Sequence, residues 1–303
     1  MSGSSFKIAH YDSLDDAVKN IFGQNIKIES TYPVSGGDIN DSYAHKLSDG
    51  TIIFMKSNRF DNESFFIAES LGLSAIAKTG AIKTPDVLCT GKDNKTSHAF
   101  SFLLLNFIQS AKRSDDYWKN FAHSLAAMHR FDFSLEKKFG FICDNYIGAT
   151  KQINTPYESW IDFFRDCRLT PQFKMADSYF DERDKTKIKT FLDKLDSLLV
   201  EPNLPSLLHG DLWAGNVMCG PDGHAMLIDP AVYIGHHEAD IAMTELFGGF
   251  PPEFYSEYKK AFPLQEGYSN RRDIYNLYQL LNHLNLFGRS YLGHVLSIVD
   301  HYA

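Results

Sequence analysis

The residues best suited to chemistry lie in the segment 208–230, LHGDLWAGNVMCGPDGHAMLIDP. Its polar core fits the pattern H-x-D-x-x-x-x-N, with Asp211 as the aspartate and Asn216 as the asparagine, and Asp229 follows thirteen positions later. A turn sequence, GPDG at 220–223, separates two apolar segments, which predicts a hairpin. We expect this hairpin to bring Asn216 and Asp229 close together, with Asp211 beside them.

Phosphoryl transfer from a nucleotide to a hydroxyl is the chemistry that suits these residues. An aspartate accepts the proton of the attacking hydroxyl, while an asparagine and a second aspartate hold Mg²⁺ on the nucleotide phosphates. Magnesium takes oxygen ligands, which a side-chain amide and a carboxylate both supply. The pattern therefore predicts Asp211 as the catalytic base, Asn216 and Asp229 as metal ligands, and ATP with Mg²⁺ as cofactors. The alternative is that all three are ordinary turn residues.

The first hundred residues predict a sheet and a helix that would position the nucleotide. Apolar segments of strand length alternate with turn signals, and one longer stretch has helical periodicity. The expected elements are helices at 14–22 and 62–78 and strands at 29–35, 42–47, 51–57, 86–90 and 99–105.

Lys56 and Glu69 are the charged residues in this part that we expect to pair. Lys56 lies in the third strand, and Glu69 lies on an otherwise apolar face of the helix 62–78. A glutamate on an apolar face costs free energy unless it is paired. Lys56 is its natural partner, and the pair would orient the lysine on the nucleotide phosphates. The alternatives are an exposed Lys56, a partly exposed Glu69, or Glu63 as the partner of Lys56.

Backbone groups at two places are expected to contact the nucleotide. Between the first two strands the sequence SGGDIN at 35–40 contains Gly36, Gly37 and Asn40, and glycines in such a turn let N–H groups approach phosphates. It is not a Walker A loop, because no G-K-[ST] follows. Where the chain leaves the last strand, backbone groups could bind an adenine edge. The candidates at that point are Asn106, Phe107 and Ile108.

The remaining two thirds of the chain are expected to be mainly helical. His129, which follows the apolar stripe of the first of these helices, is expected to be structural. The catalytic stretch interrupts the helices, and we expect Trp213 either to pack in the core or to stack on a substrate, since amphipathic aromatic side chains serve both roles. The first expected helix begins near residue 115, and the others span 159–168, 184–199, 238–247, 252–261 and 273–287.

The sequence His236-His237-Glu238-Ala239-Asp240 invites a zinc hypothesis, which the spacing disfavours. It is not H-E-x-x-H, and adjacent histidines rarely share one face. We expect instead that Asp240, near the start of a helix, accepts hydrogen bonds from backbone N–H groups of the catalytic loop.

Composition limits the class of protein. With 303 residues, 44% apolar and 22% charged, the chain suits one large domain or two lobes of a globular protein. A net charge of −8 argues against a nucleic-acid surface. The four scattered cysteines predict free thiols in the cytoplasm. The sequence has no secretory signal and no apolar run that could span a bilayer, so no membrane partner is expected.

Six segments spread over nearly the whole chain carry a family resemblance. They are HGDLWAGN at 209–216, IDPAVY at 228–233, EADIAMTELFGGF at 238–250, VSGG at 34–37 with Ile39 and Asn40, NYIG at 145–148 with Gln152 and Asn154, and YNLYQLLNHLNLF at 275–287. Together they resemble the fructosamine kinase (ketosamine-3-kinase) family. Aminoglycoside phosphotransferases and choline kinases are wider relatives that share H-G-D-x-x-x-x-N but lack the Leu-Trp and Gly-Gly-Phe sequences found here.

The resemblance implies an α+β, two-lobed protein-kinase-like fold. Its N-lobe, residues 1–106, would be an antiparallel sheet with one key helix and would bind the nucleotide. Its mainly helical C-lobe, residues 107–303, would hold the catalytic loop and the substrate. The implied partner is a small-molecule ketosamine or a glycated amine or protein. The chain is expected to be a monomer or a weak homodimer.

The implied activity is ATP-dependent phosphorylation of the sugar 3-hydroxyl of fructosamines or ribulosamines, which reverses glycation. Asp211 would be the base, Asn216 and Asp229 the metal ligands, and Lys56 with Glu69 the phosphate-orienting pair. A kinase for another small alcohol and a non-catalytic nucleotide-binding protein are the alternatives.

The chain departs from its relatives at three places. His236-His237 replaces a common Asp-Arg pair, which we expect to alter the substrate rim. Asn106 stands where relatives often have Glu, and adenine recognition by the backbone should survive that change. Asp38 stands where some members have a glycine-loop cysteine, so thiol control there is not expected.

Overall fold

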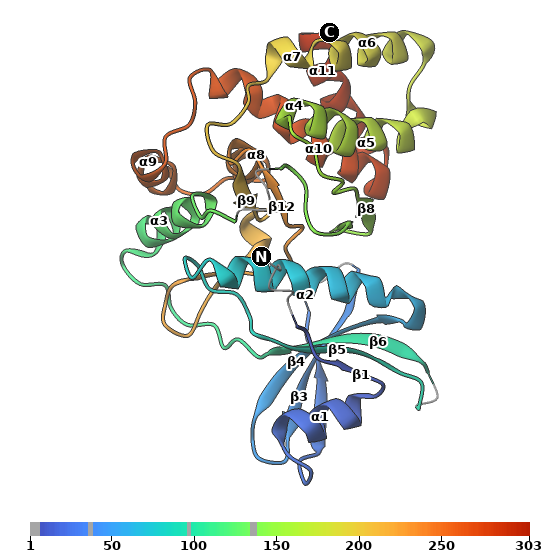
Figure 1. The fold of residues 1–303 in the computed structure, drawn as a ribbon, viewed down its shortest axis with the longest axis vertical. Helices are drawn as coiled ribbons and strands as arrows, with labels where there is room; N and C mark the ends of the chain where they lie inside the picture. Colours follow the sequence, from blue (N-terminus) through green and yellow to red (C-terminus); the bar gives the residue numbers. More distant parts are fainter. Residues whose placement is uncertain (1–6, 36–38, 96–97, 134–137) are drawn as a thin grey trace. The chain divides into compact units, whose positions relative to one another are not determined.

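The computed structural model describes residues 7–35, 39–95, 98–133 and 138–303. The chain forms two compact units, one of residues 1–117 and 218–229 and the other of residues 118–217 and 230–303. The first unit contains the large sheet, and the second is mainly helical (Figure 1). The expected α+β class is therefore confirmed, whereas the functional division between residues 106 and 107 stays a prediction.

The sheet of the first unit has six strands in the order β1-β5-β6-β4-β3-β2. Neighbouring strands run antiparallel except β1 and β5, which are parallel. The sequence did not predict β1, because two residues carry no alternation. The strands are β1 (His10–Tyr11), β2 (Ile28–Pro33), β3 (Asp41–Leu47), β4 (Ile52–Arg59), β5 (Val87–Asp93) and β6 (Phe100–Asn106).

Each face of this sheet is covered by one helix, α1 (Leu14–Phe22) or α2 (Glu63–Lys78), as Figure 1 shows. The alternation of strand side chains explains how β6 serves both helices. Phe102 and Leu104 belong to the core beneath α1, whereas Leu103 and Leu105 pack with Phe66 of α2. Both helices were predicted. They pack on opposite faces of the sheet, over β4 and β6.

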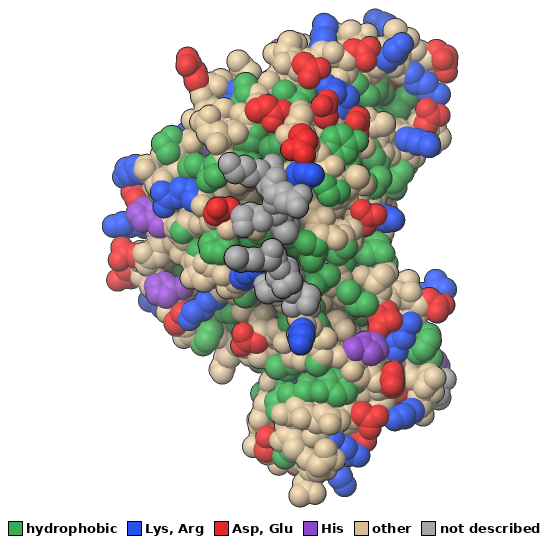
Figure 2. Space-filling view, viewed as in Figure 1, with side chains coloured by type: hydrophobic (Ala, Val, Ile, Leu, Met, Phe, Trp, Pro, Cys, Tyr) green, Lys and Arg blue, Asp and Glu red, His purple; other side chains and the backbone are tan. Residues whose placement is uncertain are grey.

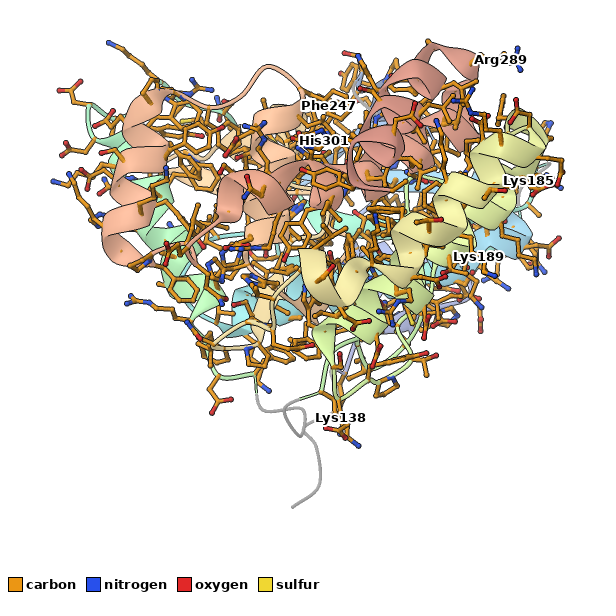
Figure 3. All side chains as sticks on the ribbon, turned by 90° about the horizontal axis from the view of Figure 1, so that it is seen from above. Lys138, Lys185, Lys189, Phe247, Arg289 and His301 are labelled. Carbon is orange, nitrogen blue, oxygen red and sulfur yellow. The ribbon has the colours of Figure 1, made fainter. Side chains whose placement is uncertain are left out.

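The second unit is built around the long helix α10, which packs against α8, α11 and α5. Its helices are α3 (Tyr117–His129), α4 (Trp160–Phe163), α5 (Thr170–Met175), α6 (Glu182–Asp193), α7 (Leu195–Leu198), α8 (Glu238–Leu246), α9 (Pro252–Ala261), α10 (Tyr268–Phe287) and α11 (Leu292–Tyr302). On the amphipathic α6, Ile188 and Phe191 are buried, whereas Lys185 is half-buried and Lys189 is exposed; both lysines are labelled in Figure 3.

The predicted helices of this unit are correct in type. The predictions 238–247 and 252–261 agree with α8 and α9 to within one residue, whereas three others differ in extent. The segment 159–168 forms α4 and then a π-helical turn, Phe164–Leu169, that leads into α5. The helix expected at 184–199 divides into α6 and α7 around Lys194, and α10 begins five residues earlier than expected. The helix α11 and the short strands of this unit were not predicted.

Two pairs of three-residue strands belong to the second unit, and a third pair, apart from its first residue Val217, belongs to the first unit. The pair β7 (Asn145–Ile147) and β8 (Thr150–Gln152) is a hairpin, whereas β9 (Ser206–Leu208) pairs with the distant β12 (Tyr233–Gly235). The predicted hairpin of the catalytic stretch is present as β10 (Val217–Cys219) and β11 (Ala225–Leu227).

Charged side chains of both signs are interspersed on the face drawn in Figure 2. Among the helices in the described ranges, none is both long enough and apolar enough to cross a membrane.

Candidate active site

The segment that contains Asp211 follows β9. It is fixed by contacts with the backbone just before β12. The carbonyl of His209 accepts a hydrogen bond from Ala231 N at 2.9 Å. Gly210 has a φ of +82°, and a Cβ there would lie 2.0 Å from the carbonyl oxygen of Ala231. Glycine is therefore required at this place, both for the left-handed backbone and for the close approach. Gln279 of α10 donates from Nε2 to the carbonyl of Gly210 at 3.0 Å.

Asn216 holds Asp211 through its amide nitrogen. Nδ2 donates to the backbone oxygen of Asp211 at 2.8 Å and to its Oδ2 at 3.0 Å. Asn216 is buried and Asp211 is half-buried. Because both amide hydrogens are directed at Asp211, the amide oxygen points the other way, where it can accept from a donor or ligate a cation.

Asp240 anchors this loop, as the sequence predicted. Its carboxylate accepts hydrogen bonds from His209 N at 2.7 Å and Gly210 N at 2.9 Å. His129 contacts Asp240 Oδ2 through Nε2 at 3.1 Å and the hydroxyl of Tyr258 through Nδ1 at 2.6 Å. The expectation that His129 is structural is confirmed, because it is fully buried among these partners. Sequence patterns gave no signal for the part played by Tyr258.

In the first unit, Lys56 of β4 forms the predicted contact with Glu69 of α2. Lys56 Nζ lies 2.7 Å from Glu69 Oε1 and also binds the carboxylate of Asp229. Burial opposes the charge on Lys56, but the attraction of Glu69 and Asp229 is stronger and raises its pKa. Burial raises the pKa of the Glu69 carboxyl despite the opposing effect of Lys56. The site roles of these residues stay predictions.

The rival partner Glu63 is engaged elsewhere. Its carboxylate lies 3.1 Å from His10 Nδ1 and 3.0 Å from Lys92 Nζ. The contact of Asp229 with Lys56 was not predicted, because the two residues are 173 positions apart in the chain.

Asp229 has an unusual backbone conformation. Its φ is 54°, the only positive φ of a non-glycine residue within the described ranges. Such a conformation costs on the order of 1–3 kcal/mol and persists only where the surroundings determine it. Asn216 directly precedes β10 and Asp229 follows β11. That the two side chains lie close together stays a prediction.

The structure describes some of the residues predicted to contact the nucleotide and not others. Gly36 and Gly37 lie outside the described residues, whereas Asn40 is held by Asn58, whose Nδ2 donates to its Oδ1 at 2.6 Å. Asn106 N donates to the carbonyl of Asp86 at 3.1 Å, and Asn106 Oδ1 accepts from Asp86 N at 2.6 Å.

Asn106 therefore uses its N–H and side-chain oxygen to close the sheet. The N–H of this residue, one of the groups predicted to bind adenine, is already bonded. The neighbouring Phe107 is 36% exposed and Ile108 is half-buried. These two residues are left as the candidates of this segment for an adenine edge.

Trp213 is 39% exposed, so the alternative that it belongs to the core is wrong. Its ring lies over Gly215, where a Cβ would be 2.3 Å from the indole. A glycine at this place therefore leaves room for the ring beside the catalytic loop.

His236 and His237 do not form a substrate rim, so that expectation is wrong. Both side chains are buried, and the His237 ring stacks on Phe262 with 4.1 Å between centroids. Burial lowers the pKa of His236 to about 3 and that of His237 to about 2, so both are neutral near pH 7. In the part of the chain that the structure describes, no group of three potential ligands forms a metal site.

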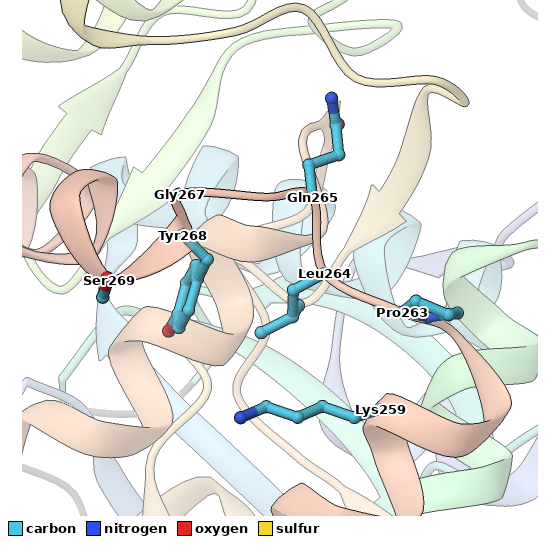
Figure 4. A pocket seen from close by; sticks show the side chains of 7 residues that line it. All are labelled: Lys259, Pro263, Leu264, Gln265, Gly267, Tyr268 and Ser269. Carbon is cyan, nitrogen blue, oxygen red and sulfur yellow. The ribbon is translucent and has the colours of Figure 1, made fainter.

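A hollow of about 400 Å³ lies between α9 and α10 in the second unit (Figure 4). None of the predicted site residues lines it. Its lining residues are Lys259, Pro263, Leu264, Gln265, Gly267, Tyr268 and Ser269.

Comparison with known proteins decides the family. The profile of the family described as fructosamine kinase matches residues 11–303. The chain belongs to the fructosamine kinase family. It is 38% identical over 291 residues to a Synechocystis protein named as a probable ketoamine kinase, with 93% of each chain covered. It is 37% identical over 285 residues to the chloroplastic protein-ribulosamine 3-kinase of Arabidopsis thaliana, covering 92% of this chain and 84% of that protein.

Solved structures agree with this assignment. A Haemophilus somnus protein, provisionally titled a fructosamine-3-kinase, superposes with a TM-score of 0.85 at 30% identity and 96% coverage of both chains. An aminoglycoside phosphotransferase, APH(4)-Ia in complex with AMP-PNP and hygromycin B, gives a TM-score of 0.60 at 15% identity, covering 95% of this chain and 98% of its own. The second likeness concerns the fold alone. This fructosamine kinase family member is therefore an ATP-dependent phosphotransferase with a kinase-like fold.

Proposed function

We propose that this enzyme transfers the γ-phosphoryl group of ATP to the sugar 3-hydroxyl of fructosamines or ribulosamines. The family assignment and the names of relatives that cover most of the chain support the substrate class. The observation that carries the proposal is the hold of Asn216 on Asp211, because it leaves a half-buried carboxylate oriented in a loop that four further hydrogen bonds fix.

The proposed roles follow from the chemistry of each side chain. Asp211 accepts the proton of the sugar hydroxyl as that oxygen attacks the γ-phosphorus. The Lys56 ammonium, whose raised pKa keeps it charged, stabilises negative charge on the nucleotide phosphates, and Glu69 orients it. Trp213 offers its exposed ring to the substrate, where a flat indole can cover a sugar ring or lie against a cationic amine.

Asn216 and Asp229 are the residues that we propose to hold Mg²⁺. They fit a hard cation, because one offers an amide oxygen directed away from Asp211 and the other a carboxylate that is 35% exposed. When bound, the ion neutralises charge on the β- and γ-phosphates. The backbone of the glycine-containing turn 35–40 and of Phe107 and Ile108 would hold the phosphates and the adenine.

A substrate panel assayed by ADP release tests the proposal. We expect turnover with ribulosyl-lysine or fructosyl-lysine and little with choline or kanamycin, all measured with ATP and Mg²⁺. Preference for choline or kanamycin would overturn the ketosamine assignment and leave the kinase assignment intact. Comparing the free lysine adduct with a glycated protein shows which form the enzyme prefers.

We further propose that the enzyme works in the cytoplasm as a monomer or weak homodimer. Free thiols at all four cysteines fit a reducing compartment. Light scattering during size-exclusion chromatography measures the oligomeric state, and a stable dimer at micromolar concentration would contradict this proposal.

A further inference from the structure

A buried hydrogen-bond network holds the backbone that follows Asp229. Asn145 of β7 donates from Nδ2 to the carbonyl of Val232 at 2.7 Å, and Gln152 of β8 donates from Nε2 to the carbonyl of Ala231 at 3.0 Å. Asn145 is 3% exposed and Gln152 is 1% exposed. Ala231 and Val232 are also buried, at 2% and 0% exposed, so the two amides satisfy buried carbonyls and determine the path of the backbone there.

The amides of this network are themselves fixed in orientation. Gln152 Nε2 and Asn154 Nδ2 both donate to Asn145 Oδ1, at 2.7 and 2.9 Å. The hydroxyl of Tyr278 donates to Gln152 Oε1 at 2.8 Å, and Arg168 donates to Asn154 Oδ1 at 2.7 Å. Because Tyr278 and Arg168 both donate, the amide groups that face them must present their oxygens. Only one orientation of the amides then satisfies every hydrogen bond.

The held backbone also contacts the catalytic loop. Ala231, two residues after Asp229, accepts from Gln152 through its carbonyl and donates through its N–H to His209, two residues before Asp211. The carbonyl of Ala231 also sets the close approach that only glycine at 210 allows. One peptide segment is thus bound on one side by the amide network and on the other by the loop of the base.

We propose that Gln152 and Asn145 are positioning residues for phosphoryl transfer. They fix Ala231 and Val232, and through that segment they restrain both the left-handed backbone at Asp229 and the loop that bears Asp211. Neither residue needs to touch nucleotide or sugar. The proposal rests on the roles proposed above for Asp211 and Asp229. It gives the buried side-chain amides of Asn145 and Gln152 a function in positioning these two aspartates.

The test compares Gln152 with a chemically matched amide elsewhere in the second unit. Asn285 Nδ2 also donates to one backbone carbonyl and one side-chain amide oxygen, both of Gln172, at 3.0 and 2.7 Å. The variants are Gln152→Leu and Gln152→Glu, with Asn285→Leu and Asn285→Asp as controls. Each pair removes the donors, once by an apolar side chain and once by a near-isosteric carboxylate.

We expect the Gln152 variants to lower kcat by about 10- to 100-fold, because a small misplacement of reacting groups has effects of that size. KM for ATP and for the sugar acceptor should stay within about threefold, since binding contacts are not removed. The Asn285 controls should keep kcat within about threefold of the wild type, even where their melting temperature falls. The kinetic measurements are made at a temperature at which circular dichroism shows each variant folded.

A wild-type kcat in Gln152→Glu, or an equal loss of kcat in the Asn285 controls, would overturn the proposal. If neither Gln152 variant folds, Tyr278→Phe replaces them, because it removes only the hydroxyl that orients Gln152. We then expect kcat to fall by about three- to tenfold with both KM values unchanged, and an unchanged kcat would overturn the proposal. All rates use the acceptor that the substrate panel identifies, so an error in the ketosamine assignment appears in the panel and not in this comparison.

Discussion

Asp211 is the residue whose replacement separates chemistry from binding. Asp211→Asn keeps the size of the side chain but removes the carboxylate that we propose as the base. We expect kcat to fall by about 10²- to 10⁴-fold, while equilibrium binding of ATP stays close to the wild-type value. ADP release and isothermal titration measure the two quantities. Normal turnover in this variant would move the base to another residue.

Replacing Lys56 should lower the unfolding free energy more than replacing Glu69, because Lys56 is the cation shared by two carboxylates. Lys56→Met leaves two carboxylates without their cation and should cost about 3 kcal/mol of unfolding free energy, near the lower limit for a broken buried pair because Asp229 is partly exposed. Glu69→Gln removes a carboxylate whose charged form burial disfavours, so it should cost less than about 1 kcal/mol. Urea denaturation measures both values.

The pH dependence of Glu69→Gln gives a sharper comparison. Folding raises the pKa of Glu69 above its ordinary value of 4.5, so the folded state favours the protonated carboxyl. That contribution to stability is complete below pH 4.5 and is lost as the pH rises through the folded pKa. The stability of Glu69→Gln relative to the wild type should therefore increase between acid and neutral pH. A constant difference would contradict the raised pKa.

At the scale of elements, the first turn of α8 holds the catalytic loop through Asp240. Asp240→Asn replaces one acceptor oxygen by an NH₂ group that faces backbone N–H donors. We expect a loss of about 2–3 kcal/mol of unfolding free energy, because a buried donor is left unpaired, together with a lower kcat. Asp300→Asn on α11, which removes a surface ion pair with Lys187, is the matched control and should change neither quantity measurably.

The connection between β12 and α8 should make the enzyme sensitive to acid. Because the pKa values of His236 and His237 fall to about 3 and about 2 on folding, the unfolded chain binds more protons below about pH 6.5. Stability is therefore complete above pH 6.5 and is lost as the pH falls. At pH 5 each histidine should cost about 2 kcal/mol, from 1.36 kcal/mol for each pH unit.

His237→Phe should reduce this loss, since phenylalanine can stack on Phe262 without binding a proton. We expect the melting temperature of the variant to fall less between pH 7 and pH 5 than that of the wild type. His224→Gln, at a solvent-exposed position, serves as the control and should follow the wild type. An equal acid response in His237→Phe would mean that other groups govern it.

Elements with a long periodic signal could be predicted from the sequence, whereas short strands could be predicted only at the β10–β11 hairpin, where a turn sequence separates two apolar segments. The helices 14–22 and 62–78 agree closely with α1 and α2 because apolar residues recur over several turns. The strands β7, β8, β9 and β12 have three residues each, and β9 and β12 pair across an intervening segment. Nothing local in such strands shows their partner, so the amide network around Gln152 was invisible before the fold was known.

At the scale of the whole molecule, the same limit applies to the site. Lys56–Glu69 and the hold of Asp240 on the catalytic loop could be predicted, because a charge on an apolar helical face or at a helix start must be paired. The contact of Lys56 with Asp229 and the burial of His236 could not, since they depend on the packing of distant segments. The sequence reveals which groups need partners, whereas tertiary packing decides among partners far apart in the chain.

Binding of ATP with Mg²⁺ should stabilise the folded chain as a whole by mass action. A ligand at one hundred times its Kd adds about 2.7 kcal/mol, and in a chain of this size each kcal/mol raises Tm by about 2 °C, so an increase of roughly 5 °C is expected. Asp211→Asn should keep this increase, because the base is not needed for binding. Asp229→Ala should lose the part that depends on Mg²⁺, since the carboxylate proposed as a ligand is gone. A Mg²⁺-dependent increase that persists in Asp229→Ala would show that the ion is held by other residues.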